Sequence, residues 1–311
     1  MTPPSFDDAR IPAELRRFIN ELTSDPKHYQ IPLRAAAATL PLEQEIQTAL
    51  QNWLTALPQA LESEEIPLGP FSAALAGSRD RLTWQVSGPA EPFILRLNRY
   101  LADFPIPEEN LDYLQSVLDD QQPQQAGAWI TARPQIFEPG WLIYPPSGQF
   151  SQIRRLLPVS EDLYRLMTWS KKNRVEQCIR VGRSLISSDG FTELVLRISS
   201  NSAASALETG MTLFDALDLP EPGEESYQVL QTNQEPELLV SLWLTVKGAA
   251  KAGLVMTGPD TDMTLHLLDA VGQADDEGLA LFEGVLDKDG PDYLEYQQLA
   301  GGESAELHYE I

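Results

Sequence analysis

The chain of 311 residues is strongly acidic, with 22 lysines and arginines against 46 aspartates and glutamates and a formal charge of −24. Such a charge repels phosphate, so it argues against broad binding to nucleic acid or to anionic membranes. The hydrophobic fraction of 42% is ordinary for a globular protein, and most of the chain is therefore expected to bury a core.

The sequence also bears on the cellular compartment. Cys178 is the only cysteine, which excludes an intramolecular disulfide and favours a reducing compartment. The first 25 residues lack the pattern of a secretory signal, in which an apolar run follows basic residues. No stretch approaches the roughly 18 consecutive apolar residues of a transmembrane helix. We therefore expect a soluble cytoplasmic protein without a membrane partner.

The N-terminal part shows helical spacing of apolar residues at 11–24, 41–57 and 107–119, which predicts three amphipathic helices. Pro12 and Pro41 suit the first turn of two of them. Short strands are predicted at 82–87 and 92–98, around Gly88 and Pro89. Residues 1–120 are therefore interpreted as a helix-rich α+β region.

Residues 128–222 are predicted to form a mixed α/β region. A helix at 160–172 has Ser160 as its cap, with acids in the first turn and lysines in the last, which suits the helix dipole. A β-hairpin is predicted around Asp189 and Gly190. Trp141 and Tyr144 stand beside consecutive prolines and are the best candidates for an exposed aromatic surface, with packing against a neighbouring domain as the alternative.

The C-terminal part alternates between apolar and polar residues from Leu238 to Val246, and turn signals recur after it. This pattern predicts an acidic antiparallel β domain over 238–311, a sandwich or small barrel with no helix longer than about two turns. Further strands are expected at 252–257, 263–269, 279–286, 292–299 and 305–311. Residues 223–237 are predicted to be a linker. The fold class expected for the whole chain is α+β.

The charge is unevenly distributed along the chain. Residues 1–150 have a net charge of −9, residues 151–203 a net charge of +4, and residues 204–311 a net charge of −19. The basic block can contact acidic protein surface, in this chain or in a partner, whereas nucleic acid is the weaker alternative. The residues predicted to bind a partner protein are Arg154, Arg155, Lys171, Lys172, Arg174, Arg180 and Arg183.

Catalytic motifs are missing from the sequence. It contains neither a Gly-x-Ser-x-Gly elbow nor a glycine-rich phosphate loop. His28, His266 and His308 are far apart and, with one cysteine, do not match the usual zinc patterns. Cys178, in a predicted strand, is interpreted as a small apolar filler. The sequence therefore predicts no catalytic residue, no metal site and no cofactor.

These observations favour a non-catalytic binding or regulatory protein, such as an adaptor, chaperone or inhibitor, that acts through protein–protein contacts. The alternative is a hydrolase whose carboxylate pair is defined only in space. The sequence favours the interaction protein over the enzyme.

Overall fold

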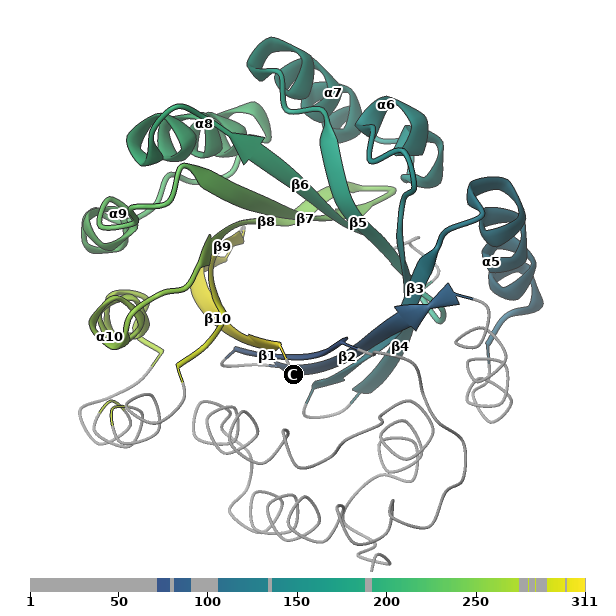
Figure 1. Cartoon of the computed structure of the whole chain (residues 1–311), viewed down its shortest axis with the longest axis horizontal. Coiled ribbons are helices and arrows are strands. Elements are labelled where there is room, and N and C mark those ends of the chain that lie inside the picture. The colour runs from purple at the N-terminus through teal and green to yellow at the C-terminus, as the bar shows by residue number, and fades with distance from the viewer. Residues whose placement is uncertain are drawn as a thin grey trace, which may run out of the picture.

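The structure, a computed structural model, shows strands arranged in a ring with helices around it (Figure 1). The predicted helices at 11–24 and 41–57 and the predicted strand at 92–98 lie outside the residues that it describes. Those residues are 72–78, 81–90, 106–133, 136–187, 192–273, 279, 283, 290–299 and 301–310.

The strands form one closed antiparallel barrel, in the order β1-β10-β9-β8-β7-β6-β5-β4-β3-β2. The ring closes because β1 pairs with β2 on one side and with β10 on the other. The strands are β1 (Ser72–Ser78), β2 (Arg81–Pro89), β3 (Gln125–Arg133), β4 (Ile136–Tyr144), β5 (Gln177–Ser184), β6 (Thr192–Ser199), β7 (Glu237–Thr245), β8 (Gly248–Thr257), β9 (Tyr293–Leu299) and β10 (Gly302–Glu310).

The described helices lie outside the barrel, between successive β-hairpins (Figure 1). The chain thus repeats a pattern in which a hairpin is followed by one or more helices. The helices are α5 (Glu108–Gln121), α6 (Phe150–Ile153), the 3₁₀ helix η2 (Arg154–Leu156), α7 (Glu161–Asn173), α8 (Ala203–Ala216), α9 (Glu224–Leu230) and α10 (Thr261–Ala270).

The hydrophobic core lies between the helices and the outer face of the barrel. Side chains alternate between the two faces of a strand, and β6 shows the result. Leu194, Leu196 and Ile198 face outward into the core cluster, while Glu193 and Arg197 face the lumen. The charged side chains of β6 consequently lie on its lumen face.

Helix α7 forms as its sequence predicts. The Ser160 hydroxyl accepts a hydrogen bond from the Leu163 amide at 3.2 Å, and Lys171 and Lys172 lie in the last turn. Asp162 in the first turn accepts a hydrogen bond from the Ala249 amide at 2.6 Å. This carboxylate joins the helix to the start of β8.

The predicted fold class is wrong. Strands β7 to β10 do not form a separate C-terminal sandwich, because they pair into the same ring as β1 to β6. Residues 263–269 belong to helix α10 instead of a strand. Asp260 caps that helix by accepting from the Met263 amide at 2.7 Å, and Met263 and Leu267 are buried one turn apart. Helix α9 likewise occupies part of the predicted linker.

The predicted aromatic surface is also wrong. Trp141 faces outward from β4 and is buried in the core beside Tyr113 of α5, with ring centroids 6.3 Å apart. Tyr144, three residues on, is on the opposite face and donates to Ser87 Oγ at 3.2 Å. An odd separation within one strand places the two rings on opposite sides of the sheet.

Two glycines make room for a tryptophan inside the barrel. Trp129 is buried with its indole over Gly140 and Gly182 of the next two strands. A Cβ at Gly140 would overlap the indole ring, and a Cβ at Gly182 would lie 3.3 Å from its Nε1. The absence of side chains at these positions therefore determines where the indole can lie.

We predict that Gly140→Ala lowers the free energy of unfolding by about 1–3 kcal/mol, because the new methyl group displaces a closely packed ring. Gly301→Ala is the matched control, since a Cβ there meets nothing within 4 Å. Urea denaturation with a fluorescence readout measures both. Equal stability of the two variants would contradict the placement of Trp129.

Candidate functional site in the barrel lumen

Polar and aromatic side chains line the inner face of the barrel, and several of them are fully buried. The strand registers alternate with the outward core residues and so define this face. Its described polar and aromatic members include Thr83, Gln85, Ser87, Trp129, Thr131, Tyr144, Arg180, Ser184, Glu193, Arg197, Glu237, Ser241, Trp243, Lys251, Tyr293, Glu295, Gln297, Ser304, Glu306 and His308.

Arg180 of β5 spans several strands of the lumen. One guanidinium nitrogen donates to Gln85 on β2 at 2.8 Å, and another pairs with Glu193 on β6 at 2.8 Å. Burial by itself would lower the pKa of Arg180, but Glu193 and Tyr144 raise it above its usual value. This guanidinium is therefore a permanent positive charge inside the barrel.

Trp129 and Trp243 meet edge to face, with ring centroids 6.1 Å apart. The Lys251 ammonium lies 4.8 Å from the centroid of the Trp243 ring, a cation–π geometry. Leu142 completes this small apolar group. The lumen thus presents an aromatic surface next to a cation.

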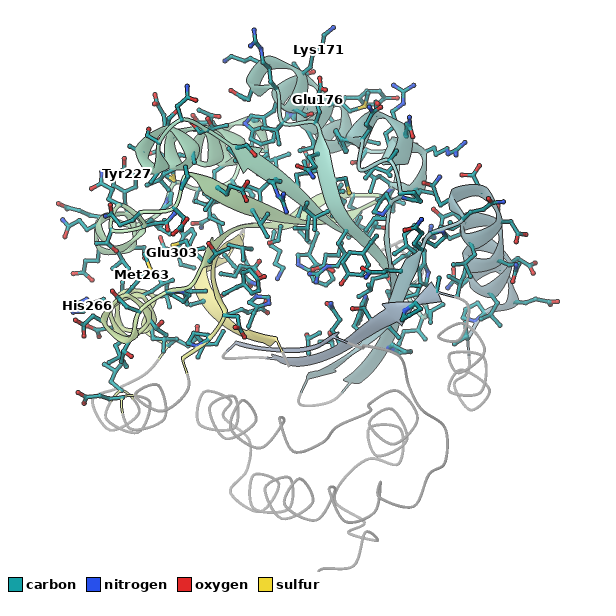
Figure 2. All side chains as sticks on the ribbon, in the orientation of Figure 1. Lys171, Glu176, Tyr227, Met263, His266 and Glu303 are labelled. Atoms are coloured by element: carbon teal, nitrogen blue, oxygen red, sulfur yellow. The ribbon has the colours of Figure 1, made fainter. Side chains whose placement is uncertain are left out.

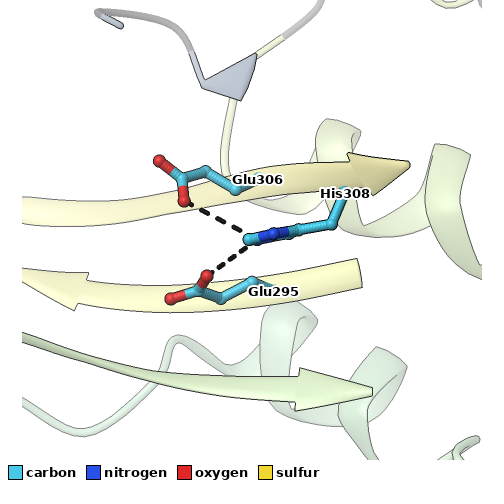
Figure 3. Close-up of side chains that lie close together, drawn as sticks. All are labelled: Glu295, Glu306 and His308. Carbon is cyan, nitrogen blue, oxygen red and sulfur yellow. Dashed lines mark hydrogen bonds and ion pairs between the residues drawn. The ribbon is translucent and has the colours of Figure 1, made fainter. Parts of the chain in front are cut away.

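The Lys251 ammonium also belongs to a compact group of polar and ionisable side chains on β7 to β10. We call Ser241, Lys251, Glu295, Glu306 and His308 the lumen cluster. His308 Nε2 is 2.8 Å from Glu295 Oε2 and 3.7 Å from Glu306 Oε2, and Figure 3 shows the imidazole reaching between the two carboxylates. Lys251 Nζ is 3.9 Å from Glu306 Oε2. Both glutamates are only 3% exposed.

The sheet register explains why the carboxylates converge. Glu295 of β9 is directly opposite Glu306 of β10, a placement that is destabilising for two like charges. Gly253 of β8 leaves space beside them, since a Cβ there would overlap the Glu295 carboxylate. The Ser241 hydroxyl donates to Glu295 Oε1 and orients that carboxylate.

Glu295 remains ionised despite its burial. Burial alone would raise the pKa of Glu295. The charge of Lys251, the hydrogen bond and charge of His308 and the Ser241 hydrogen bond together hold that pKa far below its usual range. The lumen cluster therefore keeps a buried negative charge at all ordinary pH values.

The structure brings only some of the predicted partner-binding residues together, since Arg154 and Lys171 line one surface pocket. Arg154 and Arg155 lie in η2, Lys171 and Lys172 end α7, and Arg174 follows α7 in a left-handed conformation. These five are on the outside of the molecule, and Arg155 pairs with Asp120.

The remaining two residues of the basic block lie on β5 and separate to opposite faces. Arg180 faces the lumen, while Arg183 packs over the Tyr113 ring at 4.2 Å. The interaction of the outer basic residues with a protein stays a prediction.

Cys178 is 2% exposed and belongs to the core cluster, which confirms its interpretation as an apolar filler. Burial raises the pKa of the Cys178 thiol to about 12, so the nucleophilic thiolate is absent at neutral pH. Within the described part of the chain, no helix is both long and apolar enough to cross a membrane.

Sequence reasoning missed the lumen cluster. His308 is far from His28 and His266 in sequence, so the histidine pattern alone indicates no site. A usable signal was the spacing of Glu306 and His308 by two residues, which places both on one face of a strand. The third member, Glu295, requires the β9–β10 register and is not visible locally.

We predict that the free energy of unfolding falls as pH decreases from about 5 to about 2, and that Glu295→Gln weakens this dependence. The folded-state pKa of Glu295 is lowered, so its stabilisation is present above the unfolded pKa of about 4.3 and is lost as pH falls through the folded value.

At pH 7 we expect Glu295→Gln to cost about 3 kcal/mol, because it leaves a buried charge network unbalanced. Glu208→Gln, at an exposed position of α8, is the control. Urea denaturation over this pH range measures both effects. The idea fails if the wild-type and Glu295→Gln proteins lose stability with the same pH slope.

No family model matches the chain. A PH domain-containing protein of Dictyostelium discoideum is 23% identical over 257 residues, which cover 81% of this chain and 56% of that protein. The chain thus spans little more than half the length of this curated relative.

Solved structures of prenyltransferases share the fold. The 6-dimethylallyltryptophan synthase from Micromonospora olivasterospora, in complex with DMASPP and Trp, has a TM-score of 0.57 and 13% identity, covering 92% of this chain and 97% of its own. NotF, in complex with brevianamide F and DMSPP, has a TM-score of 0.61 and 10% identity, covering 92% of this chain and 95% of its own.

These likenesses correct the functional prediction. The expectation of a non-catalytic adaptor, chaperone or inhibitor is wrong, as is its alternative of a carboxylate hydrolase, because the structural neighbours are enzymes of another kind. The 5-dimethylallyl tryptophan synthase from Streptomyces coelicolor agrees, with a TM-score of 0.53 and 11% identity, and it covers 91% of this chain and 94% of its own. The chain shares its fold with dimethylallyl tryptophan synthases and related prenyltransferases.

Proposed function

We propose that this protein is a prenyltransferase that moves a dimethylallyl group from its diphosphate to an aromatic acceptor inside the barrel. The fold supports the reaction class, and one feature of the lumen carries the proposal for this chain. Trp129 Nε1 and Arg180 Nε are buried N–H donors with no hydrogen-bond partner among the described residues. An unpaired buried donor costs about 1–3 kcal/mol, and an anionic substrate would satisfy both.

The reaction sets three requirements for the site. The bond between the allylic carbon and the diphosphate oxygen breaks, and its electron pair leaves with the diphosphate. The π electrons of the aromatic ring form the new carbon–carbon bond, and the proton of the attacked ring carbon passes to a base. The site must therefore stabilise an anion, surround a carbocation-like group and accept a proton.

Arg180 and Lys251 are suited to stabilise the leaving diphosphate. Lys251 is a buried cation on the lumen face, and Arg180 is a partly buried one. Arginine presents its donors in a planar fork that matches phosphate oxygens, and lysine acts as a point charge. Their carboxylate partners Glu193 and Glu306 hold the two cations in place before the substrate arrives.

Trp129 and Trp243 are suited to the allylic group. Aromatic faces attract positive charge, so they stabilise an allylic cation without offering it a nucleophile as reactive as water. The same rings can stack against an indole or phenol.

His308 is suited to accept the proton. Its Nε2 is hydrogen-bonded to Glu295, so in the neutral ring Nδ1 is left as the basic nitrogen. The two adjacent carboxylates then stabilise the imidazolium that forms, in the way that an aspartate supports a catalytic histidine.

The balance of charge favours a zwitterionic acceptor such as an aromatic amino acid. Among the described lumen residues, the cations Arg180, Arg197 and Lys251 stand beside the carboxylates Glu193, Glu237, Glu295 and Glu306. A lumen with both signs can bind the diphosphate of one substrate and the ammonium group of another. L-Tryptophan is the acceptor to test first.

We predict that the purified protein, incubated with dimethylallyl diphosphate and L-tryptophan, forms a product heavier by one isoprene unit, measured by liquid chromatography and mass spectrometry. Arg180→Met should lower kcat/KM about 100-fold or more, because a charge that stabilises the leaving group is lost. Arg155→Met, at an exposed site on η2, is the matched control and should retain the rate.

The double variant Arg180→Met/Glu193→Gln removes the buried pair as a unit and separates loss of chemistry from loss of folding. An unchanged rate in a folded Arg180 variant would contradict the assignment. So would the absence of any product from dimethylallyl and geranyl diphosphates with tryptophan, tyrosine and indole.

A further inference from the structure

We propose that Glu295, Glu306 and His308 form a binding site for one divalent transition-metal ion, of the Zn²⁺ or Mn²⁺ class, on the inner face of the barrel. One carboxylate oxygen from each glutamate and one histidine nitrogen lie within 4.8 Å of one another. Figure 3 shows all three side chains converging from β9 and β10. Such a mixed nitrogen and oxygen set suits Zn²⁺, Mn²⁺ and Fe²⁺.

The distances need some adjustment to accept an ion. In a tetrahedral zinc site with bonds of about 2.0–2.2 Å, neighbouring ligand atoms lie about 3.3–3.5 Å apart. His308 Nε2 is 2.8 Å from Glu295 Oε2 and 3.7 Å from Glu306 Oε2. These two separations lie on either side of the required value, and the two carboxylate oxygens lie within 4.8 Å of each other, so side-chain rotations that even out the three distances are needed.

The surroundings orient the ligands as a metal site requires. The Ser241 hydroxyl donates to Glu295 Oε1, which leaves Glu295 Oε2 turned towards His308. When a neighbouring side chain donates a hydrogen bond to a ligating carboxylate, that bond fixes the orientation of the carboxylate and tunes its affinity for the metal. Three protein ligands leave at least one coordination position for water or a substrate oxygen, as in catalytic zinc sites.

The charge of the group also favours an ion. Two carboxylates directly opposite each other, each 3% exposed, need compensating positive charge. Lys251, 3.9 Å from Glu306, supplies one positive charge. A divalent ion between the two carboxylates supplies the rest. Lys251 opposes the ion, so it sets the affinity below that of a site with no lysine.

The test uses Co²⁺ as a spectroscopic probe. The full chain, stripped with a chelator, is titrated with Co²⁺ while the visible absorption bands are followed, and Zn²⁺ is then added as a competitor. We expect one Co²⁺ per chain, with bands typical of a nitrogen and oxygen site, and displacement by Zn²⁺. A wild-type protein that binds neither ion below about millimolar concentration would overturn the proposal, since this lies at the weak limit of specific affinity.

Variants locate the ion. His308→Gln should weaken Co²⁺ binding at least about 100-fold, and Ser241→Ala about 10-fold through lost orientation. His266→Gln, on the exposed face of α10 (Figure 2), is the matched histidine control and should leave the titration unchanged. Lys251→Met should tighten binding, because it removes the opposing charge.

A structural salt-bridge network without a metal predicts the reverse pattern. In that case Lys251→Met destabilises the protein and gains no affinity, and the His308 and His266 variants titrate alike. Because the titration contains no prenyl diphosphate, its failure leaves the proposed reaction untouched, and a failure of that reaction in the metal-free protein leaves the metal site untouched. An ion on His308 Nε2 leaves the ring proton on Nδ1, so His308 can serve as the base only in the metal-free protein.

Discussion

The pairing of β1 with β10 is the constraint on which the rest of the structure depends. It closes the sheet, so each strand has an outer face that helices cover and an inner face that they cannot reach. Apolar residues therefore gather outside the barrel, where Leu194 and Leu196 are fully buried. The inner face must satisfy its own polar groups, because a buried charge without a partner is too costly to keep.

The lumen meets that requirement by pairing groups across strands. Arg180 links Gln85 to Glu193, and Lys251 links the Trp243 ring to Glu306. Glycines provide the space for these contacts. Gly140 and Gly182 accommodate the Trp129 indole, and Gly253 accommodates the Glu295 carboxylate and the Ser241 hydroxyl. Small residues thus decide where the large and charged side chains of the site can lie.

Local patterns predicted much of the secondary structure but little of the site. The cap and charges of α7 are encoded within a few residues, and the β7 alternation needs only one strand. Closure is not local, so the sequence could not show that β7 to β10 share a ring with β2. Arg180 and Arg183 looked like one basic block, yet an odd spacing within a strand sends them to opposite faces. Glu295 and His308 meet only through the β9–β10 register.

Lys251 connects the two proposals made for the lumen. Its ammonium lies against Trp243, where an allylic diphosphate is proposed to bind, and also 3.9 Å from Glu306, a proposed metal ligand. A diphosphate that takes Lys251 as its counter-ion draws positive charge away from Glu306 and leaves that carboxylate more able to hold a divalent ion. By thermodynamic linkage the ion must then strengthen diphosphate binding by the same factor. A shared lysine between an anion site and a carboxylate site therefore makes the two ligands mutually reinforcing.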